Sequence, residues 1–399
     1  MKYDVVVVGA GIVGLAVALE VLKKNHKLKL LIIEKERSVA CHQSGNNSGV
    51  IHSGLYYKPG SLKSINCING YKKIIRFCQE EEIEYKICGK IIVATSNQEL
   101  PLLNSLYNNG IKSKLAGLRF LSQNKIKDYE PYCRGIKGLL VPQTGVVNYR
   151  SVSKKYLEKF LNLGGKIHLN TKVNGIINQD NGVELLTDSD TYIAKTVVTC
   201  GGLYSDELAM YTHKDLPIRI IPFRGEYYKL KPEAQKMVEN LIYPVPNPSF
   251  PFLGVHFTKM IDGSVECGPN AVFAFAKEGY SLTDVNFSEM MESFKWPGFR
   301  KIAVKYWKEG MEEYYRSISK AAFVKALQKM IPDIQSDDLI PGGSGVRAQA
   351  CDINGNLLDD FDIRIQKNII HVCNAPSPAA TASLAIAETI SHQVVKLLK

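Results

Sequence analysis

The feature that most constrains the fold is a glycine-rich turn near the start of the chain, between an apolar strand and a helix. Residues 3–8 form an apolar run, Gly9, Gly11 and Gly14 follow, and a second apolar strand ends at Glu34. In such a turn the first glycine permits the tight bend, the second lets the backbone approach a pyrophosphate, and the third lets the helix pack closely on the strand. The helix N-terminus offers free N–H groups to phosphates. Glu34 can accept hydrogen bonds from ribose hydroxyls, so the segment predicts dinucleotide binding rather than a turn without chemical meaning.

Three later segments favour FAD over a nicotinamide dinucleotide. Residues 35–57 form a loop of small and polar residues, which can wrap a long polar cofactor with backbone and side-chain donors. Residues 196–202 predict a buried strand that ends in a glycine pair, and residues 372–378 precede an alanine-rich helix over 379–398. The N–H groups at the start of that helix would face whatever lies before it. A nicotinamide enzyme does not need its last helix to return to the cofactor, so we expect FAD.

Long strings of residues resemble those of the FAD-dependent oxidoreductase superfamily that includes D-amino acid oxidase, sarcosine oxidase and glycerol-3-phosphate dehydrogenase. They are most similar to the L-2-hydroxyglutarate dehydrogenase/oxidase family, and they span nearly the whole chain in family order. The strings cover residues 42–63, 141–152, 222–230, 245–271, 345–349 and 374–388. The resemblance implies oxidation of a 2-hydroxy dicarboxylic acid, L-2-hydroxyglutarate above all, by hydride transfer to flavin N5. The electrons would then pass to quinone or oxygen.

The expected fold is α/β, with a Rossmann-like FAD-binding domain interleaved with a mainly antiparallel-sheet substrate domain, as in D-amino acid oxidase. A chain of 399 residues that is 45% hydrophobic can form the core of two joined domains. We assign 1–80, 145–215 and 339–399 to the FAD-binding domain, and 81–144 and 216–338 to the substrate domain. Residues 218–275 alternate apolar and polar residues, as antiparallel strands do, and residues 286–331 are predicted to be mostly helical.

The positions expected to contact FAD lie in the glycine turn, in the polar loop, and at the two later segments. They are Gly9, Gly11, Gly14, Glu34, Lys35, Ser44, Asn47, Val173, Gly201, Ser377, Pro378, Ala379, Ala380 and Thr381. His42 and His52 raise the question of a histidyl–flavin bond. In related dehydrogenases with such a bond, the attached histidine falls where this chain has Asn47, so we expect noncovalent FAD.

Two histidines are candidates for the base that takes the hydroxyl proton. His52 lies just past the polar loop, where the related glycerol-3-phosphate enzymes carry a His-Gly-Gly string. Its alternative role is that of a loop histidine bonded only to backbone. His256 lies on a predicted strand of the substrate domain. It is interpreted as the base, as a donor to a substrate carboxylate, or as an ordinary packed histidine.

Candidates for substrate binding are two arginines and two tyrosines. Arg347, flanked by glycine and small residues, is our choice for the α-carboxylate, because a guanidinium can hold a carboxylate with two parallel hydrogen bonds. Arg224 is interpreted either as a substrate contact or as half of a structural ion pair. Tyr56 and Tyr57 are candidates for contact with the distal carboxylate.

The net charge of +11 has two interpretations. One is a lysine bias on solvated faces, and the other is a basic face that docks on anionic lipid, as would suit a flavoenzyme that reduces membrane quinone. Residues 294–301 and 306–308 mix aromatics with lysines, as interfacial segments do, although helices packed on the substrate domain would also explain them. No nucleic-acid-binding module accompanies the charge, so no nucleic-acid partner is expected.

The spacing of the cysteines, histidines and apolar stretches indicates where in the cell the protein is expected and whether it is expected to bind a metal. Nine cysteines without paired spacing indicate reduced thiols in the cytoplasm, and dispersed cysteines and histidines give no reason to expect a metal. The first strand begins at residue 3, which leaves no room for a leader, and no apolar stretch is long enough to cross a membrane. We therefore expect a cytoplasmic protein, with peripheral binding to the inner face of the cytoplasmic membrane as the alternative.

Two rival functions remain open from the sequence. One is an amine or amino-acid oxidase of the glycine or sarcosine type in the same superfamily. The other is a flavin-binding subunit that docks on membranes and has no turnover of its own. The motifs present along the whole chain argue against the second.

Overall fold

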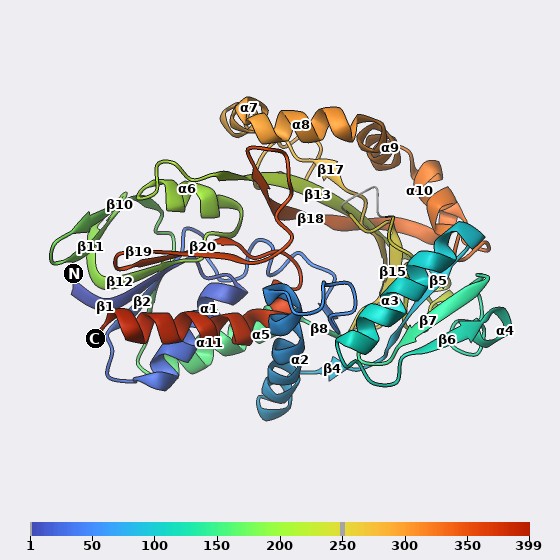
Figure 1. Ribbon diagram of the computed structural model, residues 1–399, viewed down its shortest axis with the longest axis horizontal. Helices are drawn as coiled ribbons and strands as arrows, with labels where there is room; N and C mark the ends of the chain where they lie inside the picture. The colour runs from blue at the N-terminus through green and yellow to red at the C-terminus, as the bar shows by residue number, and fades with distance from the viewer. Residues whose placement is uncertain (1, 248–251) are drawn as a thin grey trace.

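The computed structural model describes residues 2–247 and 252–399, so part of the string 245–271 lies outside the described residues. Two sheets lie side by side, and long strands arch from one toward the other (Figure 1). Helices cover the lower face of the first sheet and the outer face of the second, and both chain ends lie at the edge of the first sheet (Figure 1). This arrangement confirms the predicted D-amino acid oxidase-like α/β fold.

The first sheet has eight strands among the described residues, in the order β10-β11-β12-β1-β2-β9, with β20 beside β12 and β19 beside β20. The strands are β1 (Lys2–Val8), β2 (Leu30–Ile33), β9 (Lys166–His168), β10 (Val173–Gln179), β11 (Gly182–Thr187), β12 (Thr191–Thr199), β19 (Asp362–Gln366) and β20 (Ile369–Asn374). Strands β12, β1, β2 and β9 run parallel, as does β20 beside β12. The sheet is therefore assembled from three separate stretches of sequence.

Strand β1 is central because its apolar run can be buried on both faces. Val5 and Val7 pack with helices on one face, and Val6 and Val8 pack with β2, β10 and β11 on the other. Parallel strands covered on both faces read as continuous apolar runs rather than alternating ones. The helices on the first face are α1 (Ile12–Lys24), α2 (Leu62–Glu80), α5 (Tyr149–Asn162) and α11 (Ala379–Leu397). Helix α6 (Ser205–Met210) contributes Leu208 to the second face.

The second sheet has nine strands in the described part of the chain, and most neighbours are antiparallel. The strands are β5 (Lys90–Ala94), β6 (Arg119–Ser122), β7 (Lys137–Val141), β13 (Ile218–Leu230), β14 (Leu241–Pro244), β15 (His256–Lys259), β16 (Val265–Gly268), β17 (Val272–Phe273) and β18 (Leu339–Asp352). Strand β14 pairs with β5 in parallel, unlike the antiparallel pairing predicted for 218–275. This joins two distant stretches of sequence into one sheet.

One predicted boundary differs from the structure. Residues 339–352, which we assigned to the FAD-binding domain, form β18, which pairs along its whole length with β13 in the second sheet. The apolar pattern of β18 is interrupted by glycines and does not show which partner strand it takes. A small third sheet joins β3 (Val50–Ile51), β4 (Tyr85–Lys86) and β8 (Gly145–Val147), between the two larger ones.

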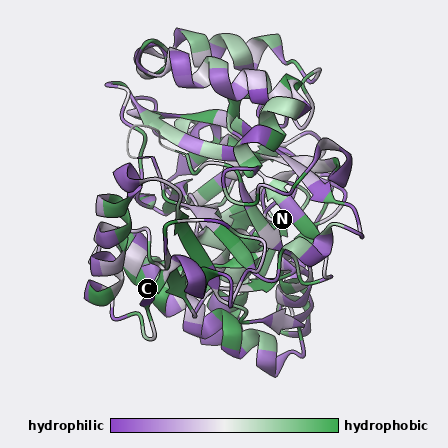
Figure 2. Cartoon of the chain, turned by 90° about the vertical axis from the view of Figure 1, so that its right-hand side faces the viewer, coloured by the Kyte–Doolittle hydropathy of each residue, from purple (hydrophilic) through white to green (hydrophobic). Residues whose placement is uncertain are grey.

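The predicted helical region over 286–331 forms an outer layer above β13 and β18 (Figure 1). It consists of α7 (Phe287–Lys295), α8 (Pro297–Lys305), α9 (Trp307–Ile318) and α10 (Lys320–Leu327). Phe299 and Ile302 of α8 are buried against β13 and β18 residues. The outward side carries both apolar and charged residues, visible as mixed colours in the uppermost helices (Figure 2). Helices α3 (Leu100–Lys112) and α4 (Gln123–Ile126) pack on β5, β6 and β7.

Candidate active site

The glycine turn has the geometry that its motif predicts. Gly9 has φ of +104°, and a Cβ there would lie 2.4 Å from the carbonyl oxygen of Cys200. A Cβ on Gly14 would lie 2.0 Å from the carbonyl oxygen of Gly9, so only glycine lets α1 approach β1 this closely. Gly11 is the N-cap of α1 and carries no side-chain cap of its own. Apart from the N–H of Ile12, which a loop side chain accepts, the first-turn N–H groups of α1 can face a phosphate group.

The polar loop closes over the start of α1. The Ile12 N–H donates to Ser44 Oγ at 2.9 Å, so Ser44 holds the loop beside the helix N-terminus. Asn47 donates to the carbonyl oxygens of Gln43 and Ser44 at 3.0 and 2.8 Å, which folds the loop on itself. These hydrogen bonds hold the loop beside the place where a pyrophosphate would meet the helix.

A cavity of about 510 Å³ runs from the start of α1 to the second sheet and gathers most of the predicted site residues. The predicted residues that line it are Gly11, Gly14, Ser44, Asn47, His52, Tyr56, Tyr57, His256, Arg347, Ser377, Pro378, Ala379, Ala380 and Thr381. They come from the glycine turn, the polar loop, β15, β18 and the N-terminus of α11. Segments more than 300 residues apart therefore meet in one space.

Six other predicted residues do not line this cavity in the described part of the chain: Gly9, Glu34, Lys35, Val173, Gly201 and Arg224. Glu34 is buried at the end of β2 and accepts the N–H of Ala10 at 2.6 Å, which places its carboxylate beside the glycine turn. Lys35 pairs with Glu36 and, at 2.5 Å, with Glu278. Val173 begins β10, and Gly201 follows the end of β12.

His256 is buried on β15 in a defined tautomer. Its Nδ1 lies 2.9 Å from the carbonyl oxygen of Gly254, so Nδ1 carries the proton and Nε2 is free to accept one. Its ring lies 4.0 Å from the ring of Tyr243. Burial lowers the pKa of His256 to about 3, and the charges of Arg347 and Lys90 add to that effect. The imidazole is therefore neutral at physiological pH.

His52 lies on the opposite wall, beside α11. Its backbone N–H donates to Thr381 Oγ1 at 3.1 Å, and its ring Nε2 lies 3.5 Å from Ser377 Oγ. Burial lowers the pKa of His52 to about 3, with further contributions from Lys90 and from His256. The His52 ring faces the cavity, and its polar contact among the described residues is with the side chain of Ser377 rather than with backbone. Both candidate bases thus share one space, and both are unprotonated.

The two arginines lie on opposite faces of the same pair of strands. Arg347 stands across from Phe223, and Arg224 stands across from Val346. Because directly opposed residues share a face and successive residues alternate, the two side chains point to opposite faces. Arg347 lines the cavity, with its guanidinium 5.3 Å from the ring centre of Phe252 and no ion pair or hydrogen bond among the described residues.

Arg224 is fully buried on the other face. It contacts Glu226 at 3.2 Å and donates to the carbonyl oxygen of Ser281 at 2.7 Å. The structure therefore places Arg224 in an ion pair and away from the cavity, and its alternative role as a substrate contact does not fit. The pairing of β13 with β18 joins residues more than 100 positions apart. Its register determines that Arg347 faces the cavity and that Arg224 faces away from it.

Sequence reasoning missed three residues of this region. Lys63 and Tyr243 line the cavity, and Lys90 lies directly behind Tyr56 and Tyr243. Lys63 pairs with Asp359 at 2.7 Å. The available signal for Lys90 was its place at the start of the wholly buried strand KIIVA, where a lysine is unusual.

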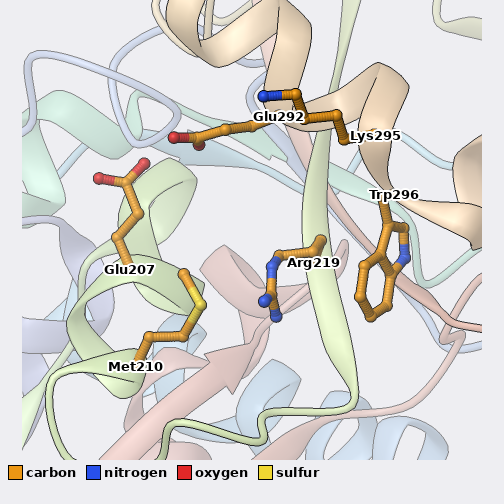
Figure 3. A pocket seen from close by; sticks show the side chains of 6 residues that line it. All are labelled: Glu207, Met210, Arg219, Glu292, Lys295 and Trp296. Atoms are coloured by element: carbon orange, nitrogen blue, oxygen red, sulfur yellow. The ribbon is translucent and has the colours of Figure 1, made fainter.

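Two other groups lie apart from the cavity. A hollow of about 390 Å³ between α6, β13 and α7 is lined by six side chains, and its lining includes neither the glycine turn nor a histidine (Figure 3). Glu36, His42 and Glu278 bring their ligand atoms within 4.8 Å of one another. The Lys35 ammonium pairs with both carboxylates, so a cation from the chain itself already lies among them.

Comparison with known proteins identifies relatives of the whole chain. Residues 4–393 match the family model described as FAD dependent oxidoreductase. The chain is 54% identical to L-2-hydroxyglutarate dehydrogenase of Indibacter alkaliphilus, over 99% of this chain and 100% of that protein. It is 44% identical to the mitochondrial L-2-hydroxyglutarate dehydrogenase of Homo sapiens, over 98% and 89% of the two chains.

Solved structures share the fold at lower identity. The FAD-bound L-alpha-glycerophosphate oxidase of Mycoplasma pneumoniae matches with a TM-score of 0.80 and 23% identity, over 100% of this chain and 95% of that one. Glycine oxidase from Geobacillus kaustophilus matches with a TM-score of 0.74 and 16% identity, over 99% and 95%.

Proposed function

Because the chain belongs to the FAD dependent oxidoreductase family, we propose that it oxidises L-2-hydroxyglutarate to 2-oxoglutarate, the substrate that names its relatives. The observation that carries this proposal is the cavity. It joins a phosphate-binding turn to two neutral imidazoles and an unpaired guanidinium. Oxidation of a hydroxy acid needs these groups, because a base takes the hydroxyl proton and a cation fixes the carboxylate.

The residues present fit noncovalent FAD. The open backbone at Gly11 and the start of α1 suits the pyrophosphate, and Glu34 beside the turn suits the ribose. The N-terminus of α11, at Ser377 to Thr381, lines the opposite wall, where its dipole suits the electron-rich edge of a flavin ring. In related dehydrogenases with a histidyl–flavin bond the attached histidine falls at the position of Asn47, whose amide in this chain is engaged in the loop. Bound FAD supplies the hydride acceptor at N5.

The chain's own side chains then orient the substrate and move the proton. Arg347 binds the α-carboxylate with two parallel hydrogen bonds and so fixes Cα toward the flavin. His256 accepts the hydroxyl proton at Nε2, while Gly254 holds its Nδ1–H. His52 is the second candidate for this step, on the wall beside Ser377. Binding of a carboxylate offsets the positive charge near His256 and raises its affinity for the proton.

Separate replacement of the two histidines tests the reaction class. A general base contributes about 100- to 10,000-fold in rate. We therefore expect His52→Asn or His256→Asn to slow anaerobic flavin reduction by L-2-hydroxyglutarate at least about 100-fold, with FAD content unchanged. His392→Asn, on the exposed side of α11, is the matched control. If neither variant slows bleaching, the hydroxy-acid mechanism fails and the rival amine oxidation, which needs no strong base, gains support.

For the electron acceptor, we propose membrane quinone, reached through a docking face on α7, α8 and α9. The docking face consists of the exposed residues Phe287, Val304, Trp307, Met311, Tyr315 and Ile318, each at least 60% exposed, with the exposed lysines Lys295, Lys301, Lys305 and Lys308. Apolar side chains among lysines suit the surface of an anionic bilayer. No helix among the described residues is long and apolar enough to span a membrane, so attachment through this face would be peripheral.

Vesicle sedimentation tests the docking face. We expect the protein to bind vesicles that contain phosphatidylserine, to bind phosphatidylcholine vesicles weakly, and to be released by salt. Combined replacement of Val304, Trp307 and Ile318 by serine should abolish binding. The matched control replaces Ile111, Leu161 and Ile177, exposed apolar residues elsewhere on the surface. Equal loss in both triple variants, or binding that ignores lipid charge, would contradict the proposal.

A further inference from the structure

The molecule buries a lysine that has no acidic partner. Lys90, the first residue of β5, is only 2% exposed. Its ammonium has no ion pair and no hydrogen bond among the described residues, and residues 248–251, Pro-Ser-Phe-Pro, contain no acid. An isolated buried charge is costly unless something compensates it. Burial lowers the pKa of Lys90 to about 7, so an anion bound near it would favour the charged ammonium.

Aromatic rings surround this ammonium and separate it from the cavity by one layer of side chains. It lies 4.3 Å from the ring centre of Tyr56 and 4.9 Å from that of Tyr243. Ring faces attract a cation and compensate part of its lost hydration. Both tyrosines line the cavity. Lys90 also contributes to the lowered pKa of both His52 and His256, so its charge acts at the site where the reaction is proposed to occur.

A second unsatisfied group lies at the same wall. The Tyr56 hydroxyl is buried and has no hydrogen-bond partner among the described residues. Buried hydroxyls without a partner are rare, and each one needs an explanation such as a bound water or ion. An anion that enters beside Tyr56 would accept from this hydroxyl and would also be the missing counter-ion of Lys90.

The other cations of the cavity are already accounted for. Arg347 serves the α-carboxylate in the proposed reaction. Lys63 pairs with Asp359 at 2.7 Å and lies 4.8 Å from the ring centre of Tyr57. A 2-hydroxy dicarboxylate carries a second negative charge, and this charge needs a cation of its own once it leaves water.

We propose that Lys90 and Tyr56 form the subsite for the distal carboxylate of the substrate, an inference that rests on the function proposed above. The distal carboxylate accepts a hydrogen bond from the Tyr56 hydroxyl and is attracted by the charge of the Lys90 ammonium, which lies against the rings of Tyr56 and Tyr243. Arg347 and Lys90 then hold the two ends of one dianion, with His256 in electrostatic range of both. The subsite selects dicarboxylic over monocarboxylic 2-hydroxy acids, because a neutral end would leave Lys90 buried and unpaired.

The test compares L-2-hydroxyglutarate with its 5-amide, which has the same shape without the distal charge. Apparent dissociation constants come from anaerobic stopped-flow reduction of the flavin in the full-length holoenzyme. We expect Lys90→Met to weaken binding of L-2-hydroxyglutarate about 10-fold, through loss of a nearby charge, and that of the amide less than about threefold. Tyr56→Phe, which keeps the ring over Lys90, should cost about 3- to 10-fold for the dicarboxylate alone.

Lys137→Met is the control for these variants. Lys137→Met removes a lysine that also lies over a ring, that of Phe120 on the neighbouring strand pair, but away from the cavity, and it should behave as the unmodified protein. Unchanged preference for the dicarboxylate in both Lys90→Met and Tyr56→Phe overturns the subsite. So does loss of that preference in Lys63→Met alone. If the unmodified protein is not bleached by L-2-hydroxyglutarate at all, it is the proposed function that fails.

Discussion

At the scale of single residues, the pairing of β13 with β18 gives two arginines on neighbouring strands different surroundings. Arg347 faces the cavity without an ion pair or hydrogen bond among the described residues, whereas Arg224 is buried with Glu226 on the other face of the sheet. A guanidinium left unpaired at a cavity wall is suited to bind an anion, and one enclosed with a carboxylate is suited to hold strands together. Their substitution should therefore affect different measurements.

We predict that Arg347→Lys lowers kcat/KM for L-2-hydroxyglutarate about 100-fold or more, because an ammonium cannot replace two parallel hydrogen bonds. Arg224→Met should instead lower the free energy of unfolding by about 2 kcal/mol, because it removes the cation beside Glu226. Among the described residues, Glu226 then keeps only the neutral partners Asn270 and Ser317. Steady-state kinetics and urea unfolding of both variants separate the two effects. A kinetic defect as large in Arg224→Met as in Arg347→Lys, at full FAD content, would contradict the assignment.

The two cavity histidines also predict how stability depends on pH. Their pKa is lowered to about 3 in the folded protein, against about 6.5 in the unfolded chain. Between these values the unfolded chain binds more protons, so this contribution to stability is complete above pH 6.5 and is lost as the pH falls. We expect the Tm to fall from pH 7 to pH 5, and to fall less in the His52→Asn/His256→Asn double variant. Equal falls in the two proteins would show that these histidines titrate normally.

At the scale of elements, the turn between β1 and α1 depends on close backbone packing. We predict that Gly14→Ala lowers both FAD content and Tm, because its Cβ would meet the Gly9 carbonyl oxygen at 2.0 Å. Gly310→Ala in α9, where the added methyl meets nothing within 4 Å, should instead stabilise the protein by about 0.5–1 kcal/mol through helix propensity. Absorbance at the flavin band and thermal unfolding measure both. FAD content unaffected by Gly14→Ala would contradict the role of the turn.

How well each part of the site could be predicted from the sequence depends on how far apart its residues lie along the chain. The β1–α1–β2 unit is encoded within about 34 consecutive residues, so its glycines and Glu34 could be assigned before the structure was known. The place of β18 beside β13, and so the different surroundings of Arg347 and Arg224, depends on pairing across more than 100 residues. Lys90 escaped notice for the same reason, since Tyr56 and Tyr243 come to it from distant segments. Local motifs predicted the cofactor half of the site better than its substrate half.

At the scale of the whole molecule, the interleaved chain brings the two sheets together at one cavity. The first sheet and its helices contribute the glycine turn and the start of α11, and the second sheet contributes His256, Arg347 and the wall near Lys90 (Figure 1). The outer helices place the docking face on the far side of β13 and β18 from the first sheet (Figure 2). Substrate and membrane would thus meet different faces of the molecule.

We propose that the protein oxidises an L-2-hydroxy dicarboxylate in this cavity, with FAD as the hydride acceptor. The most direct test is the anaerobic absorbance spectrum of the purified protein before and after addition of L-2-hydroxyglutarate, with D-2-hydroxyglutarate and sarcosine as controls. We predict a yellow protein whose flavin band is bleached by the L-hydroxy acid and by neither control. Bleaching by sarcosine instead, or a colourless protein that takes up no FAD, would contradict it.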